Sequence, residues 1–161
     1  MVTKRAVLLA KIRNKIVYTC QWAVDNADQI DYIDPSPRPM KTLNLWKTKT
    51  LPISGADCSE TATGIYFSAG APDPNHNNYN GIGNTRIMFS TNPFITKSEV
   101  RHGDIGLFVD ANGLATHAII AMVRYGDSVF THGSASGPHI YTLSQEQSYH
   151  LSESLVWIRV S

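Results

Sequence analysis

The chain has 161 residues, a formal net charge of +1 and 17% charged residues. This length supports one hydrophobic core, so we expect a single domain over residues 1–161. The balanced charge provides no basic surface for nucleic acid and no acidic tail. The two cysteines, Cys20 and Cys58, form no CxxC motif and no zinc-finger spacing. The sequence therefore predicts no disulfide framework, no metal site and no cofactor.

The N-terminal segment starts with basic residues, but its apolar run ends at Lys11. Such a run is too short for a signal-peptide core or a membrane span, so we expect synthesis in a cytoplasm and no membrane span. Apolar residues then recur at helical spacing from Val7 onward, at Leu8, Ile12, Ile16, Cys20, Ala23, Ala27 and Ile30. This stripe predicts one long amphipathic helix, bent or broken near Thr19, with Cys20 as a small core residue.

A break and an unassigned connection follow this helix. The prolines between Asp34 and Pro39 favour an extended segment, because each removes a backbone donor and biases the residue before it. Residues 40–52 show no pattern that assigns them to a helix or a strand.

The next helix is predicted to begin at Cys58. Asp57 followed by Glu60 is a capping-box pattern, with Asp57 as the N-cap and Glu60 reaching back to the N–H of the cap. Cys58 then occupies the first helical position, where unpaired N–H groups and the helix dipole favour a negative sulfur. Cys58 is therefore a candidate nucleophile, the alternative being a small buried cysteine that only packs.

The cysteine helix is expected to run to Ala69 and to stop at Gly70, with Ile65, Tyr66 and Ala69 facing inward. Gly64 in its middle predicts that another group packs closely on that face. Residues 71–85 are rich in proline, glycine and asparagine and predict a surface loop, either the wall of a cleft or a plain excursion.

From Gly103 the pattern changes to strands and turns. We expect strands at residues 104–110, 114–125, 129–132, 139–143 and 155–160, with turns at 110–113 and 125–128 and an unassigned connection at 143–151. Helices followed by an antiparallel meander are typical of the α+β class, in which helices are segregated to one side of a sheet.

Two histidines fall on this predicted sheet. If Tyr125 and Gly126 form the corner, His132 pairs with Ile119 and lies diagonal to His117 on the same face. A corner one residue later keeps both histidines on one face, but farther apart. One imidazole could then take a thiol proton while the other orients it.

Cys58, His117 and His132 together would supply a nucleophile, a base and an orienting group. The alternatives are a hydrogen-bonded core residue for His117 and a strand-end residue for His132. The remaining candidates, His102, His139 and His150, are expected to be surface or packing residues.

Three pieces of sequence resemble the NlpC-type, papain-like family of cell-wall cysteine peptidases. They are the run from Asp57 to Ser59, Gly103-Asp104 at the entry to the strand before His117, and the run from Phe130 to His132 after a tight turn. The resemblance covers residues 55–137. It implies a papain-like fold in which the nucleophile helix packs on an antiparallel sheet, with Cys58 as nucleophile, His117 as base and His132 as third member.

The resemblance also implies hydrolysis of peptidoglycan stem peptides, often at the link between D-glutamate and a diamino acid. Asp57, Ser59 and Tyr32 would then line the pocket for the start of the stem peptide. Two departures concern the shape of the cleft. Glu60 stands where the family usually has glycine, and the tyrosine with a glycine pair that usually precedes the cysteine is missing.

The protein resembles the lysins of phages that infect Gram-positive or mycolate-bearing bacteria, which reach the wall after release from the cytoplasm. A toxin delivered by another secretion route fits as well. Two other functions stay open at this point. One is a CHAP-like amidase that cuts N-acetylmuramoyl-L-alanine or a cross-bridge, and the other is a catalytically silent cell-wall or tail-assembly module.

Overall fold

The computed structural model describes residues 1–34, 42–134 and 136–161. Its N-terminal part consists of α1 (Lys4–Asp25), η1 (Ala27–Gln29), β1 (Ile30–Tyr32), α2 (Leu43–Thr48), β2 (Ile53–Ala56) and α3 (Cys58–Ala69). A middle part follows, with α4 (Thr85–Thr91), β3 (Phe94–Ile95) and η2 (Lys97–Glu99). The C-terminal part contains β4 (Ile105–Val109), β5 (Ala115–Ala121), η3 (Arg124–Gly126), β6 (Ser128–Gly133), β7 (Ser136–Thr142), α5 (Leu143–Ser148) and β8 (Ser154–Ile158).

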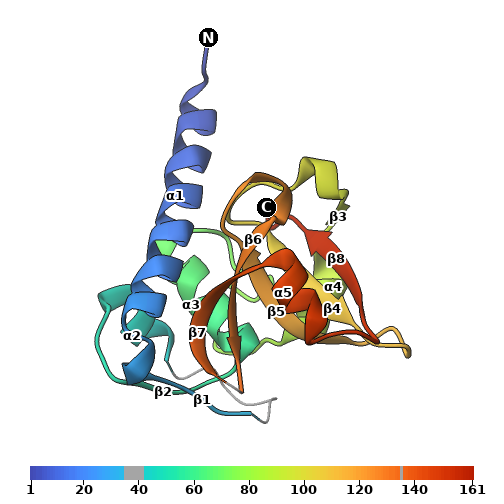
Figure 1. The fold of residues 1–161 in the computed structure, drawn as a ribbon. Helices are drawn as coiled ribbons and strands as arrows, with labels where there is room; N and C mark the ends of the chain where they lie inside the picture. The colour runs from blue at the N-terminus through green and yellow to red at the C-terminus, as the bar shows by residue number, and fades with distance from the viewer. Residues whose placement is uncertain (35–41, 135) are drawn as a thin grey trace.

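The centre of the molecule is a six-stranded sheet with the strand order β3-β8-β4-β5-β6-β7. Strands β4 to β7 form the predicted meander, and β8 returns to pair with β4 in an antiparallel manner. The N-terminal helices lie beside this sheet, and the first turns of α1 project beyond the rest of the molecule (Figure 1). The predicted α+β class is therefore confirmed.

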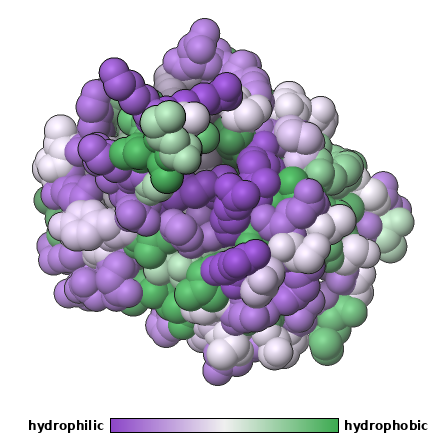
Figure 2. Space-filling view, turned by 90° about the horizontal axis from the view of Figure 1, so that it is seen from above, coloured by the Kyte–Doolittle hydropathy of each residue, from purple (hydrophilic) through white to green (hydrophobic). Residues whose placement is uncertain are grey.

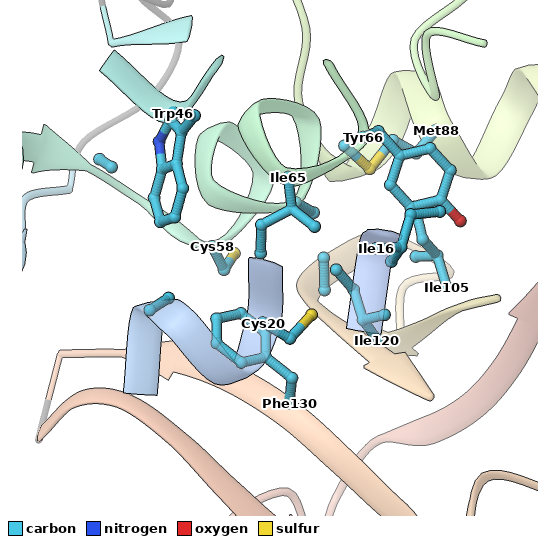
Figure 3. Packing of buried hydrophobic residues seen from close by; sticks show 14 of the residues in the cluster. Ile16, Cys20, Trp46, Cys58, Ile65, Tyr66, Met88, Ile105, Ile120 and Phe130 are labelled. Carbon is cyan, nitrogen blue, oxygen red and sulfur yellow. The ribbon is translucent and has the colours of Figure 1, made fainter. Parts of the chain in front are cut away.

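Side chains alternate between two cores, one on each face of the sheet, as the two-residue period of a strand requires. On the helix side, Ile120 and Phe130 pack with Cys20 of α1 and Ile65 of α3. Figure 3 shows Ile65 pointing from α3 toward Cys20 and Phe130. On the other side the apolar cluster comprises Val100, Phe108, Ile119, Ala121, Val129, Leu143 and Trp157. Since Leu143 belongs to α5, a short helix also covers the second face.

The long helix predicted to reach Ile30 ends earlier. α1 runs from Lys4 to Asp25, and the N–H of Asn26 caps it by donating to carbonyls of the last turn. Ile30 is buried, but in β1, where it pairs with Ile53 of β2. Ile30 fits the helical spacing of apolar residues, but it is buried because it lies in β1 and pairs with β2. Of the proline-rich segment, the part from residue 35 to 41 lies outside the described residues.

The cysteine helix agrees with its prediction. α3 begins at Cys58, ends at Ala69 and is followed by Gly70 in the left-handed region, with φ 70°. The close packing expected at Gly64 is provided by Trp46 of α2, because a methyl group on Gly64 would overlap the indole ring.

A buried carboxylate ties the N- and C-terminal parts together. Asp104 is 1% exposed and forms ion pairs with Arg13 of α1 at 2.9 Å and with Arg159 at 2.7 Å. The backbone N–H of Arg101 also donates to it. The Gly103-Asp104 motif thus fixes α1 against the strand that leads to His117.

The connection between α3 and β3 contains a helix that was not predicted. Residues 85–91, after the expected loop, form α4, which starts with Asn84 as its N-cap. The loop itself is anchored by Asp73, whose carboxylate accepts hydrogen bonds from the backbone of Asn75, Asn77 and Tyr79. It is therefore a well-bonded segment of the structure.

The N-terminal half of α1 is exposed, including the apolar residues Val7, Leu8 and Leu9. The view onto this end of the molecule shows hydrophobic residues in separate patches between hydrophilic ones (Figure 2). Within the described part of the chain, no helix has the length and apolar character needed to cross a membrane.

Candidate active site

Cys58 stands at the first position of α3, held there by the cap before it. The side chain of Asp57 accepts a hydrogen bond from the N–H of Glu60 at 2.8 Å and from the hydroxyl of Ser59 at 2.8 Å. Cys58 is 7% exposed. Because the first N–H groups of a helix have no intrahelical partner, the backbone at this point presents donors to whatever lies beside the sulfur.

The second half of the predicted capping box is wrong. The carboxylate of Glu60 accepts hydrogen bonds from the N–H of Thr42 at 3.1 Å and from its hydroxyl at 2.9 Å. Glu60 is 3% exposed, so this carboxylate anchors the segment before α2 instead of closing the cap. The residue that departs from the family pattern therefore has a structural role at the base of the cysteine helix.

His117 lies next to Cys58, as predicted. It is the third residue of β5, is 9% exposed, and its imidazole interacts with the side chain of Cys58. Burial by itself disfavours the charged imidazole, but the Cys58 sulfur and the Glu146 carboxylate outweigh burial and raise the pKa of His117.

The group behind His117 is Glu146 of α5, which sequence reasoning missed. Its Oε1 lies 3.2 Å from Nε2 of His117 and accepts a hydrogen bond from the Thr131 hydroxyl at 3.0 Å. Thr131 in turn lies 2.8 Å from the same Nε2. Because the Thr131 hydroxyl donates its proton to Glu146, it must accept a hydrogen bond from the N–H at Nε2 of His117. In this tautomer Nδ1 carries no proton and is the nitrogen that can accept one from Cys58. Burial raises the pKa of Glu146, but its bonds to the histidines outweigh that and lower it.

A signal for this helix was present in the sequence. Thr142 and Gln145 form a complete capping box at the start of α5, so Glu146 lies in the helix, and His150 follows just beyond its C-cap Tyr149. His150, expected to be a surface or packing residue, lies 3.4 Å from Oε1 of Glu146 through its Nε2. Exposed His139 and partly exposed His102, which bonds to Asn14, make no such contact with this site.

The predicted register of His132 is wrong. Ile119 pairs with Thr131, not with His132, so successive residues of β6 exchange faces and Thr131 is the residue beside His117. His132 points instead toward α3, where its Nδ1 lies 2.8 Å from the Thr61 hydroxyl. It is 1% exposed, and among the described residues its Nε2 has no hydrogen-bond partner. Burial, with a smaller effect of His117, lowers the pKa of His132 to about 4.

Tyr32 is brought to the site although the proline segment separates it from Cys58 in sequence. Its ring contacts that of His132 edge to face, with centroids 5.2 Å apart. Burial, followed by the charges of Cys58, Asp34 and Asp57, raises the pKa of Tyr32. The structure thus places all three residues expected to contact substrate, Tyr32, Asp57 and Ser59, around Cys58.

A cavity of about 480 Å³ opens beside Tyr32. One wall is formed by η1 and β1, including Asp31 and Tyr32, and the other by Gly133, Ser134 and Gly137 around the turn between β6 and β7. The cavity provides space for an extended ligand next to the tyrosine.

The second cysteine, Cys20, is fully buried among apolar residues, and burial raises its pKa, so its predicted packing role fits its position.

No family model and no curated protein matches the sequence. The backbone does match solved structures, among them the crystal structure of the NlpC/p60 domain of the peptidoglycan hydrolase SagA. That match has a TM-score of 0.56 and 19% sequence identity, and it covers 92% of this chain and 97% of that one. The chain therefore has the fold of an NlpC/p60 domain, with a cysteine at the start of the helix that packs on its antiparallel sheet.

Proposed function

We propose that this protein is a cysteine peptidase that hydrolyses stem-peptide bonds of bacterial peptidoglycan. The observation that carries the proposal is the contact between Cys58 and a buried His117 whose pKa is raised and whose Nε2 lies 3.2 Å from Glu146. A thiol at a helix start, a base beside it and a carboxylate behind the base are what nucleophilic acyl transfer requires. The fold shared with a domain of a peptidoglycan hydrolase supports the substrate class.

In the proposed mechanism, Nδ1 of His117 takes the proton of Cys58, and the sulfur attacks a peptide carbonyl carbon. The N–H of Cys58, at the first position of α3, donates to the developing oxyanion. The protonated His117 then gives its proton to the leaving amine, which departs and leaves a thioester on Cys58. Water, deprotonated by the same imidazole, attacks the thioester and restores the free thiol.

Glu146 is the third member in this proposal, in place of His132. Its carboxylate holds the Nε2 side of the imidazole and stabilises the imidazolium that forms during each proton transfer. His132 has a different position, between Thr61 and Tyr32. Tyr32, Asp57 and Ser59 are proposed to bind the start of the stem peptide beside the cavity at β1.

We assign the cleaved bond more finely to the link between D-glutamate and a diamino acid. We also propose that the protein is a lysin, which is made in the cytoplasm and acts on the cell wall after release. Digestion of purified peptidoglycan, followed by mass spectrometry, tests both the class and the bond. New amino groups on the diamino acid support the assignment, whereas intact stem peptides freed from muramic acid indicate an amidase instead. Products that persist with Cys58→Ala, in a variant that keeps its fold, would contradict the nucleophile.

A further inference from the structure

Three metal-ligating side chains meet at Nε2 of His117. His117, Glu146 and His150 each offer one donor atom, and these three atoms lie within 4.8 Å of one another. Oε1 of Glu146 is 3.2 Å from Nε2 of His117 and 3.4 Å from Nε2 of His150. The proposed peptidase mechanism uses His117 and Glu146 but has no role for His150.

The spacing of these atoms fits a tetrahedral transition-metal ion. Zinc binds imidazole nitrogen and carboxylate oxygen at about 2.0–2.2 Å, which separates neighbouring ligand atoms by about 3.3 Å. Two of the three separations already have this value. Two imidazoles and one carboxylate suit zinc or cobalt better than magnesium or calcium, which prefer sets of oxygen ligands.

The groups around the cluster also resemble the surroundings of a metal site. Nδ1 of His150 lies 3.3 Å from Oε1 of Glu153, an outer carboxylate of the kind that orients a metal-bound histidine through its other nitrogen. The ring of His150 stacks on Phe108, with centroids 3.9 Å apart, and lies 16° from parallel to the His117 ring. The side chain of His150 is 16% exposed, which gives an ion a way in from solvent.

We propose that His117, Glu146 and His150 form an inhibitory binding site for Zn²⁺, with water in the fourth position. A zinc ion there bonds to Nε2 of His117 and to Oε1 of Glu146, so it replaces the contact that positions the imidazole. A neutral imidazole bound to the metal through Nε2 carries its single proton on Nδ1, so Nδ1 can no longer accept the proton of Cys58. The binding site stands by itself, whereas its inhibitory effect rests on the proposed function.

The test measures zinc binding and activity separately. Zinc affinity is determined by competition with a chromogenic chelator for the wild-type protein, Cys58→Ala, His150→Ala and His139→Ala. The last variant is the matched control, because His139 is an exposed histidine that pairs with Thr131 of β6 but is not one of the three ligands. We expect one zinc ion per chain in wild type, Cys58→Ala and His139→Ala, and an affinity at least 100-fold lower in His150→Ala.

Activity without zinc should be retained in His139→Ala, and the inhibition of His150→Ala is measured relative to its own zinc-free rate. Zinc should inhibit the wild type and His139→Ala, while His150→Ala should need at least 100-fold more zinc for the same inhibition. Equal zinc affinity in His150→Ala and wild type would overturn the site. So would loss of binding in Cys58→Ala, which would place the ion on the sulfur.

A spectrum of the wild-type protein with Co²⁺ decides the matter even if His150→Ala does not fold. Ligation by His117, Glu146 and His150 predicts visible d–d bands without the strong near-ultraviolet band of a cobalt–thiolate bond. A strong thiolate band would overturn the proposal. If no variant or wild-type sample hydrolyses peptidoglycan, the proposed function fails, but the binding titrations and this spectrum still decide whether the site exists.

Discussion

Oε1 of Glu146 lies 3.2 Å from Nε2 of His117. The two residues come from α5 and β5, and Thr131 of β6 connects them by hydrogen bonds to both. Glu146 is 3% exposed. A buried carboxylate of this kind is stabilised when the ring beside it carries a proton, so each group favours the charged form of the other.

Glu146→Gln should therefore reduce kcat, with little change in KM, because the amide cannot stabilise the imidazolium. For the comparable substitution of an orienting aspartate, the loss is roughly 10⁴-fold, and we expect a loss of at least 100-fold here. His132→Asn, which can keep a bond to Thr61, is the matched variant and should retain most of the activity. Hydrolysis of a defined muropeptide measures both. A large loss in His132→Asn with an active Glu146→Gln would restore His132 as third member.

The register between β5 and β6 explains why the sequence identified the base but not its partner. Cys58 and His117 were found because a helix cap and a strand can each be recognised locally. His132 was assigned by assuming which residues form the corner, and a shift of one residue moves a side chain to the opposite face. The register between β5 and β6 depends on the turn that joins them, which contains η3. Tyr125 in this turn has a positive φ of 67°, and its residue type did not predict this conformation.

Other parts of the fold were missed because their signals are not local. β1 and β2 form a parallel pair joined through the segment that contains α2, and neither strand is long enough to show a period. By contrast, α5 had a readable capping box, so Glu146 could have been placed on a helix. Its contact with His117 depends on how α5 packs over the sheet, which only the tertiary structure reveals.

The buried His132 predicts a loss of stability in mild acid. Its pKa is about 4 in the native state, and an exposed histidine titrates near 6.5. Between these values the unfolded chain binds the proton and the native state does not, so stability falls as the pH drops. The loss amounts to at most about 3 kcal/mol. His132→Asn should show a smaller fall between pH 6.5 and 4 in urea unfolding, and equal slopes would contradict the assignment.

Asp104 should be the main anchor between α1 and the sheet. Asp104→Asn leaves Arg13 and Arg159 without their common counter-ion, and breaking a buried ion pair in this way should cost about 3 kcal/mol. Asp127→Asn is the control, because Asp127 pairs with Lys97 on the surface and should contribute at most about 1 kcal/mol. Chemical denaturation gives both values, and similar losses in the two variants would argue against the anchor.

Gly64 should tolerate no side chain while Trp46 is present. Gly64→Ala should destabilise the protein by about 1–3 kcal/mol through overpacking, despite the better helix propensity of alanine. The same substitution in a Trp46→Leu background should cost less, because the indole that the methyl group meets is gone. A double-mutant cycle in urea measures the coupling, and strictly additive losses would show that the close contact does not limit this position.

The contact between Cys58 and His117 is tested most directly by the rate at which iodoacetamide alkylates Cys58 at pH 6.5. His117 is the group proposed to take the thiol proton before alkylation, and buried Cys20 should not react, so Cys58→Ala serves as the blank. We predict rapid modification of one cysteine in the wild-type protein and at least a tenfold slower reaction in His117→Gln. An unchanged rate in His117→Gln would contradict the pairing on which the proposed mechanism depends.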